Sequence, residues 1–167
     1  DSAAYGINDS GQITGYTSSH GGYVGYVYRE GQVRLLGELE PGGGSIGRAI
    51  NRWGHVTGEA RVGTKTHAFR YRNGVMTDLG VLGNGDDATG LAINDAGQVV
   101  GSSKRNYDEL TWRAFIFTAG HMYDLNALTD RRGGFVLRWA ADINNAGQIV
   151  GTGAYPGQYG RAFLLTP

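Results

Sequence analysis

The stretch "INDAGQVVG" at residues 93–101 decides how the chain is read, because three further copies of it occur. "INDSGQITG" begins at residue 7, "INRWGHVTG" at residue 50 and "INNAGQIVG" at residue 143. The register is marked by Asn8, Asn51, Asn94 and Asn144, which are 43, 43 and 50 residues apart. A period of this length is typical of repeat proteins such as β-propellers, whose blades take about 40–45 residues.

Each copy predicts two strands joined by a four-residue turn. In Asn-x-x-Gly, the Asn side chain can hydrogen-bond the backbone of its own turn and the Gly can adopt a positive φ. We therefore interpret the four asparagines as turn residues. The strand after the turn points one β-branched residue inward and closes at a glycine. The inward residues are Ile13, Val56, Val99 and Ile149, and the closing glycines are Gly15, Gly58, Gly101 and Gly151.

The strand before the turn carries mostly small residues two and four positions before the Asn. Because side chains alternate along a strand, we expect these residues to share one face, with an isoleucine on the other. So small a face indicates backbones that crowd together, as at the axis of a radial assembly. The small positions hold Ala4 and Gly6, Gly47 and Ala49, Gly90 and Ala92, and Ala140, with Asp142 as the exception. The isoleucines are Ile7, Ile50, Ile93 and Ile143.

Two more strands follow in each copy. The third strand is "HAFRY" at 67–71, "RAFIF" at 113–117 and "RAFLL" at 161–165, which place Phe69, Phe115 and Phe163; the first copy reads "VGYVY" at 24–28. The pairs Glu30-Gly31, Asn73-Gly74 and Ala119-Gly120 then predict hairpin turns. The fourth strand reads "VRLLG", "MTDLG" and "MYDLN", ending at Leu36, Leu79 and Leu125. No helical periodicity interrupts this pattern.

The pattern predicts a single all-β domain made of four repeats of a four-stranded antiparallel meander. The units are residues 1–43, 44–86, 87–135 and 136–167, approximately. One such unit cannot bury its apolar face alone, so stacking against its neighbours must form the core. We expect a closed, propeller-like ring of four blades, with the last blade lacking a strand. A β-solenoid or a sandwich of stacked hairpins is the alternative.

Composition excludes several classes of function. Fifteen basic and fifteen acidic residues balance, so neither nucleic acid nor an anionic membrane is expected as a partner. The absence of cysteine excludes disulfides, thiolate metal sites and thiol nucleophiles. No apolar run approaches the roughly 18 residues of a membrane helix. Since the chain begins at Asp1 without a leader, we expect an exported protein whose signal peptide has been removed.

The repeat also resembles a known family. "THAFRYRNGVMTDLGVLGNG" at 66–85, followed by "AINDAGQVVG" at 92–101, is similar to one full unit of the bacterial extracellular HAF-repeat family, named for its His-Ala-Phe motif. The closing "INNAGQIVGTGAYPGQYGRAFLLTP" is similar to the end of such repeat domains, and the resemblance covers nearly the whole chain. Only His67 keeps the His of the motif, while Arg113, Arg161 and Val24 replace it. The resemblance implies an exported or surface protein with no catalytic residues to carry over.

Candidate catalytic and metal-binding residues do not form a known pattern. The four histidines, His20, His55, His67 and His121, occupy four different repeat positions without zinc-site spacing. Asp86 and Asp87 beside Asn84 lack the spacing of a calcium loop. Asp78 and Asp124 share one repeat position and are interpreted as strand residues rather than a glycosidase pair. We therefore predict no enzyme activity, no metal and no cofactor.

The variable segments suggest where a ligand would bind. Both departures from the 43-residue period lie in the connectors after the second and fourth strands, and insertions on one face of a repeat array usually mark its binding face. That face is predicted to carry His20, Lys65, Arg105, Asn106, Tyr107, Asp130, Arg131, Tyr155 and Tyr159. Such a mixture suits a glycan or a protein partner at the bacterial surface. The alternative is that these loops vary because nothing constrains them.

The three tryptophans are not part of the predicted ligand face. Trp53 lies in the first turn of its unit, at the opposite end, and Trp112 and Trp139 are interpreted as core residues. Taken together, the sequence predicts a non-catalytic binding or display module. Two alternatives stay open, namely a self-associating surface structural protein and a carbohydrate-active enzyme on a propeller scaffold.

Overall fold

The computed structural model describes residues 1–19, 22–104, 112–130, 132–158 and 160–167. It confirms the all-β prediction, since the strands form three sheets. Within the described ranges, helix is confined to α1 (Leu125–Leu128) and the 3-10 turn η2 (Arg132–Gly134), so none of it could span a bilayer. The sequence pattern did not predict α1, which begins where the Asp124 carboxylate accepts a hydrogen bond from Asn126 N.

The strands follow the four units in order. The first unit contains β1 (Ser2–Ile7), β2 (Ile13–Ser19), β3 (Gly22–Arg29) and β4 (Gln32–Leu35). The second contains β5 (Ser45–Ile50), β6 (Val56–Val62), β7 (Lys65–Arg72) and β8 (Val75–Gly80). The third contains β9 (Asp87–Ile93), β10 (Val99–Lys104), β11 (Trp112–Thr118) and β12 (His121–Asp124), and the fourth contains β13 (Val136–Ile143), β14 (Ile149–Ala154) and β15 (Arg161–Leu165). Consecutive strands of a unit pair antiparallel.

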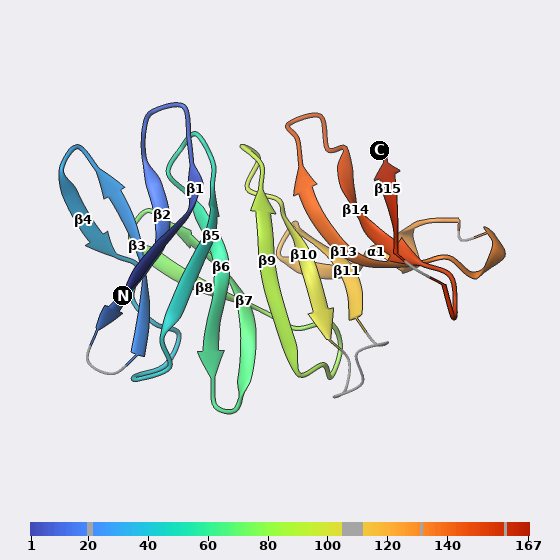
Figure 1. Ribbon diagram of the computed structural model, residues 1–167, viewed down its shortest axis with the longest axis horizontal. Coiled ribbons are helices and arrows are strands. Elements are labelled where there is room, and N and C mark those ends of the chain that lie inside the picture. The colour runs from blue at the N-terminus through green and yellow to red at the C-terminus, as the bar shows by residue number, and fades with distance from the viewer. Residues whose placement is uncertain (20–21, 105–111, 131, 159) are drawn as a thin grey trace.

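The units stand in an open row rather than a ring. The first unit, in blue, and the last, in orange and red, lie at opposite ends of the long axis in Figure 1, and none of the sheets closes on itself. The expected closed ring is therefore not found. The second and third units share one sheet through a single parallel bridge, where Thr66 N donates to Asp87 Oδ1 at 3.0 Å.

The turns have the backbone geometry that their residues predict. The glycines of the four Asn-x-x-Gly turns have φ between 71° and 79°. In the other hairpin turns, Glu30, Asn73 and Ala119 have φ of 50°, 52° and 50°, and each is followed by a glycine with φ above 80°. Two successive positive φ angles define the type I′ turn, whose twist matches that of paired strands.

The prediction that the two small positions share one face is wrong. A bulge separates them in every unit, between Gly47 and Ala49 in β5 for example, and interrupts the alternation. As a result they face opposite neighbours. A Cβ on Gly47 would meet Thr14 Oγ1 of the preceding unit, whereas Ala49 packs on the cluster shared with the following unit. The expected backbone crowding is present, but on both sides of the strand.

The bulge also explains the glycine that closes the second strand. A Cβ added to Gly58 would overlap the carbonyl oxygen of Ile46 on the paired strand, and the other three closing glycines meet equivalent carbonyl oxygens. The ring of Phe69 lies against Gly58 from the next strand and fills the space that a side chain would occupy. Phe69 and Phe115 are fully buried, while Phe163 in the last unit is only partly buried.

The core consists of three separate apolar layers, one at each junction between neighbouring units. Leu36 of the first unit packs with Ile50, Val56 and Phe69 of the second. Leu79 and Leu125 occupy the same place at the next two junctions. Each unit therefore has two apolar sides, and stacking rather than folding of a single unit buries them.

Candidate functional site

The row has two long edges, one on each side of the stacked units. We name them the turn end and the connector end after the connections between strands that lie there. The turn end holds the Asn-x-x-Gly turns and the type I′ turns; in Figure 1 the turns between β1 and β2, and between β13 and β14, lie at the top. The connector end holds the links between the second and third strands of a unit and the links between units; the link between β6 and β7 lies at the bottom of the view. The predicted ligand face lies at the connector end.

At the turn end, the repeated asparagines form a ladder that joins the units. Each Asn side chain caps its own turn, as Asn94 Oδ1 does by accepting from Gln98 N at 3.0 Å. Its Nδ2 also donates to the backbone oxygen of the next Asn in the row. These distances are 2.8 Å from Asn8 to Asn51, 3.0 Å from Asn51 to Asn94 and 3.3 Å from Asn94 to Asn144. The asparagines therefore fix both the turn and the stacking.

A second set of hydrogen bonds between units lies at the residue that follows each ladder asparagine in the sequence. Asp95 N donates to Asn145 Oδ1 at 2.9 Å, and Asp95 Oδ1 accepts from Arg52 N at 3.3 Å. A groove of about 430 Å³ runs over the ladder, lined by residues of the same three positions from all four units. Because its polar atoms hold the units together, we assign this groove a structural role.

Beside the ladder lies a polar hollow around Trp53, whose side chain is 59% exposed. Trp53 Nε1 donates to Asp95 O at 3.1 Å, and the Arg52 guanidinium stacks 4.4 Å from the Trp53 ring centroid. A cavity of about 410 Å³ there is also lined by His55, Arg70 and other polar residues. Burial, followed by the positive charges of Arg72 and Arg70, lowers the pKa of His55. Trp53 therefore takes part in a contact between the second and third units.

Of the predicted ligand residues, three lie within the described ranges at the connector end. Lys65 Nζ donates to Gly85 O at 3.0 Å and lies 3.7 Å from Asp86 Oδ1, so it ties two connectors together. Asp130 and Tyr155 line one cavity of about 330 Å³ with Phe135. His20, Arg105, Asn106, Tyr107, Arg131 and Tyr159 lie outside the described residues, and their part of the prediction stays open.

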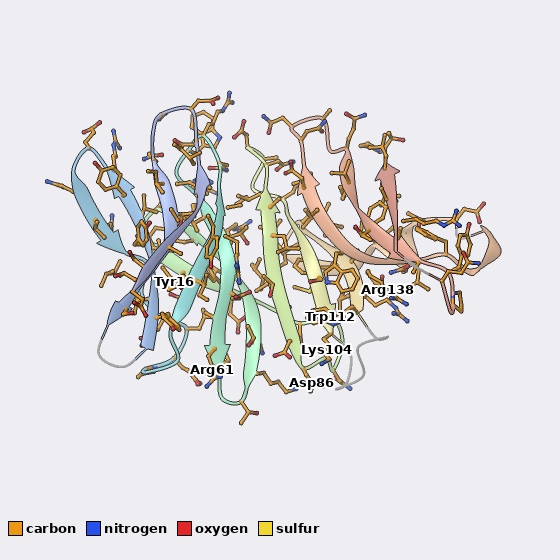
Figure 2. The ribbon with its side chains drawn as sticks, viewed as in Figure 1. Tyr16, Arg61, Asp86, Lys104, Trp112 and Arg138 are labelled. Atoms are coloured by element: carbon orange, nitrogen blue, oxygen red, sulfur yellow. The ribbon has the colours of Figure 1, made fainter. Side chains whose placement is uncertain are left out.

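An aromatic pair near these connectors was not predicted as a surface feature. Trp112, at the start of β11, and Trp139, in β13, lie with ring centroids 6.2 Å apart, and both are half-buried rather than core residues. Lys104 Nζ lies 5.9 Å from the Trp112 ring centroid. Figure 2 shows Lys104, Trp112 and Arg138 in one region of the molecule. Nothing in the repeat pairs these tryptophans, because they come from different units and different strand positions.

Arg138 gives this region a further positive charge. Its Nε is shielded from solvent and has no hydrogen-bond partner among the described residues. Asp87 lies opposite Lys104 on the paired strand β9 and accepts a hydrogen bond from Thr66 N. Asp86 is paired with Lys65. We call Lys104, Trp112, Arg138 and Trp139 the tryptophan patch.

His67, Asp78 and Asp124, which were considered as catalytic or metal-binding candidates, make contacts that stabilise the fold. His67 Nδ1 lies 2.9 Å from Asp78 Oδ2 on the neighbouring strand, and Asp78 Oδ1 also accepts from Gly80 N at 2.7 Å. Asp124 caps α1. Across the described part of the chain, no group of three or more His, Cys, Asp or Glu side chains is placed to hold a metal ion.

Comparison with known proteins gives a likeness in fold. No family model and no curated protein matches the chain. Among solved structures, the orthorhombic crystal form of Pyrococcus horikoshii acylaminoacyl peptidase is similar, with a TM-score of 0.58 and 13% identity over 98% of this chain. The match covers 25% of that chain, so this chain spans about a quarter of the length of its structural neighbour. At this identity the likeness concerns the fold alone.

Proposed function

We propose that this chain is a non-catalytic repeat domain of an exported or surface protein, and that it binds an acidic glycan at its connector end. We further propose that its units are blades of a propeller-like arc. The observation that carries the binding proposal is the tryptophan patch, in which the ring centroids of Trp112 and Trp139 lie 6.2 Å apart and Lys104 Nζ lies 5.9 Å from the Trp112 ring centroid. Lys104 and Trp112 flank the lengthened connector of the third unit in the sequence.

The chemistry of the patch favours a sugar carrying negative charge. Indole faces pack against the apolar C–H faces of sugar rings, while amphipathic tryptophans keep a polar edge for hydrogen bonding. Lys104 and Arg138 add two cations, and charge-assisted hydrogen bonds to carboxylate or sulfate groups are stronger than neutral ones. Asp86 pairs with Lys65 rather than with Lys104.

Repetition supports a scaffold role for the rest of the chain. The residues shared by all units hold the turns and junctions, whereas the tryptophan patch arises from residues that differ between units. A site built on such differences is what a binding module on a repeat scaffold requires.

An array of neutral and acidic glycans tests the proposal. We expect the intact domain to bind acidic glycans, and Trp112→Ala and Lys104→Ala each to weaken binding at least tenfold while the circular dichroism spectrum is unchanged. Trp53→Ala is the matched control, because it removes an exposed indole from the turn end. The bound glycan should be recovered uncleaved.

Other outcomes would overturn the assignment. Loss of binding in Trp53→Ala alone would move the site to the turn end. Cleavage of the glycan would establish an enzyme, and a blank array with capture of a purified surface protein would replace the glycan by a protein partner.

A further inference from the structure

Two cavities at the turn end adjoin each other and are lined by arginines of neighbouring units. The first, of about 410 Å³, is lined by Arg70 and Arg72 of the second unit together with residues of the third. The second, of about 560 Å³, lies between the first and second units and is lined by Arg29 and Arg34 of the first. The residues that line both cavities are Trp53, His55 and Asn73. We call this joined hollow the arginine groove.

The fold brings arginines of two units together in this groove. Arg70 and Arg72 are two positions apart on β7, so their side chains leave the same face of the strand. Arg34, on β4 of the first unit, reaches across the junction to the turn that follows Arg72. A Cβ added to Gly74 in that turn would lie 2.9 Å from Arg34 Nη2. The three guanidinium groups therefore gather around one hairpin turn of the second unit.

The acidic side chains that line the groove are paired with other arginines. Asp95 Oδ2 lies 3.3 Å from Arg52 Nε, and Glu30 Oε1 lies 3.5 Å from Arg29 Nε. The remaining arginines of the groove form no ion pair within the described part of the chain; they are Arg34, Arg70 and Arg72. Three positive charges are therefore left without a carboxylate partner in the groove.

Part of the groove is held in place before any ligand binds. Arg70 Nη1 donates to Gly97 O at 3.0 Å, and its guanidinium carbon lies 5.5 Å from the Phe117 ring centroid. His55 reports the positive field, since burial, followed by the charges of Arg72 and Arg70, lowers the pKa of its imidazole. A fixed guanidinium in a positive field is what a site for an anion requires.

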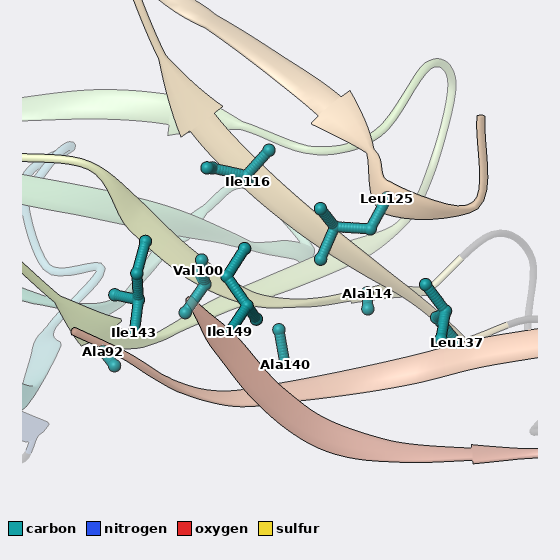
Figure 3. Close-up of a cluster of buried hydrophobic side chains, with 9 residues drawn as sticks. All are labelled: Ala92, Val100, Ala114, Ile116, Leu125, Leu137, Ala140, Ile143 and Ile149. Carbon is teal, nitrogen blue, oxygen red and sulfur yellow. The ribbon is translucent and has the colours of Figure 1, made fainter. Parts of the chain in front are cut away.

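The repeat scaffold does not require arginine at these positions. The counterpart of Arg70 in the third unit is Ile116, which packs with Leu125 in the apolar cluster of the third junction (Figure 3). The counterpart of Arg72 in that unit is Thr118. The positive charge is therefore a feature of one region of the row rather than of the repeat, as expected of a binding site on a repeat scaffold.

We propose that the arginine groove binds a small oligoanion with the chemistry of a diphosphate. A guanidinium group presents several N–H donors in a planar fork that matches the oxygens of a phosphate, and it stays charged at physiological pH. One phosphate group lies against Arg70 and Arg72 in the first cavity, and the other lies against Arg34 in the second. A single phosphate cannot reach both cavities. Because the groove lies at the turn end, the proposal is independent of the tryptophan patch.

Isothermal titration calorimetry with inorganic pyrophosphate, inorganic phosphate and acetate, at equal ionic strength, tests the proposal. We expect pyrophosphate to bind the intact chain more tightly than phosphate does, and acetate not to bind. Arg34→Gln and Arg72→Gln should each weaken pyrophosphate binding about tenfold. Both side chains are exposed, so circular dichroism should be unchanged. Arg61→Gln is the matched control, because it makes the same change in the second unit at the opposite edge (Figure 2).

The imidazole of His55 gives a second readout. Bound pyrophosphate should raise the pKa of His55 toward its ordinary value, because the negative charge offsets the effect of Arg72 and Arg70. An NMR titration of the imidazole with and without pyrophosphate measures this shift. A pKa that pyrophosphate leaves unchanged would place the anion elsewhere and overturn the proposal.

The source of the diphosphate is distinguished by adenosine diphosphate. Affinity equal to that of pyrophosphate indicates that the phosphates alone are recognised, and tighter binding indicates that a nucleoside adds contacts, with Trp53 as the exposed aromatic side chain of the groove. Failure of the intact chain to bind pyrophosphate at about 10 mM overturns the proposal. Equal weakening by Arg61→Gln, or weakening by Lys104→Ala at the tryptophan patch, also overturns it.

Discussion

Phe115 in the third unit and Tyr26 in the first occupy the same position on the third strand, opposite the closing glycine of their units. Phe115 is fully buried, whereas Tyr26 lines an open groove. The two units have the same strand order and the same turns, so the fold of the unit does not account for the difference. The difference in burial comes from the neighbouring second unit, which packs against Phe115. Burial at this position therefore depends on a junction between units.

The largest expected effect contrasts these two aromatic residues. Phe115→Ala should lower the free energy of unfolding by about 3–5 kcal/mol, because it opens a cavity in a covered junction. Tyr26→Ala should cost about 1 kcal/mol at protein concentrations where the chain is monomeric. Denaturant unfolding of both variants checks this. Equal losses would show that the first unit is packed as fully as the inner ones.

The next effect tests the fit between threonine and glycine at a junction. Gly90→Ala places a methyl group against Thr57 Oγ1 of the preceding unit, so it should destabilise the chain by about 1–3 kcal/mol. The first unit carries Ala4 at this position, and Ala4 is exposed. Ala4→Gly should therefore change the free energy of unfolding by no more than about 1 kcal/mol. A Gly90→Ala chain as stable as its parent would contradict the close approach.

The ladder gives a smaller contrast. Asn51→Ala removes a turn cap and a buried hydrogen bond to the following unit, whereas Asn144→Ala removes only the cap. We expect Asn51→Ala to cost more than Asn144→Ala by about 1 kcal/mol, the usual contribution of one hydrogen bond. Thermal unfolding of the monomeric chains provides the measurement. The reverse order would show that the bond between units contributes nothing.

The smallest effect concerns pH. Burial, with Arg72 and Arg70, lowers the pKa of folded His55 below the ordinary 6.5, so the unfolded chain takes up the proton more readily. The stability that neutral His55 contributes is thus fully present above about pH 6.5 and is lost as the pH falls below it. His55→Gln should reduce this loss between pH 7 and 5, since Gln12, Gln98 and Gln148 fill the same place in the other units. An unchanged pH profile would rule His55 out as its source.

The repeat predicted the units, the strands and the turns because those features depend on local residue types. Asn-x-x-Gly and Asn73-Gly74 specify backbone geometry within four residues, and each copy confirms the others. The bulge between Gly47 and Ala49 was missed because alternation assumes that every residue pairs. The helix α1 was missed because it needs only Asp124 as a cap and four residues.

Features that depend on neighbouring units could not be predicted in the same way. Closure of the row depends on the angle between units, which no residue of a single unit specifies. The contact of Trp112 with Trp139 joins positions that never recur together.

Cysteine cross-linking tests the central claim, that stacked units bury the core at their junctions, most directly. Asp95 and Asn145 touch across the third junction, where Asp95 N donates to Asn145 Oδ1 at 2.9 Å. Since the chain has no cysteine, a variant with both Asp95→Cys and Asn145→Cys carries two thiols that face each other across this junction. When it is mildly oxidised, it should form a disulfide within one chain and unfold at a higher temperature than its reduced form. Failure to form that disulfide, or disulfides between chains alone, would contradict the account.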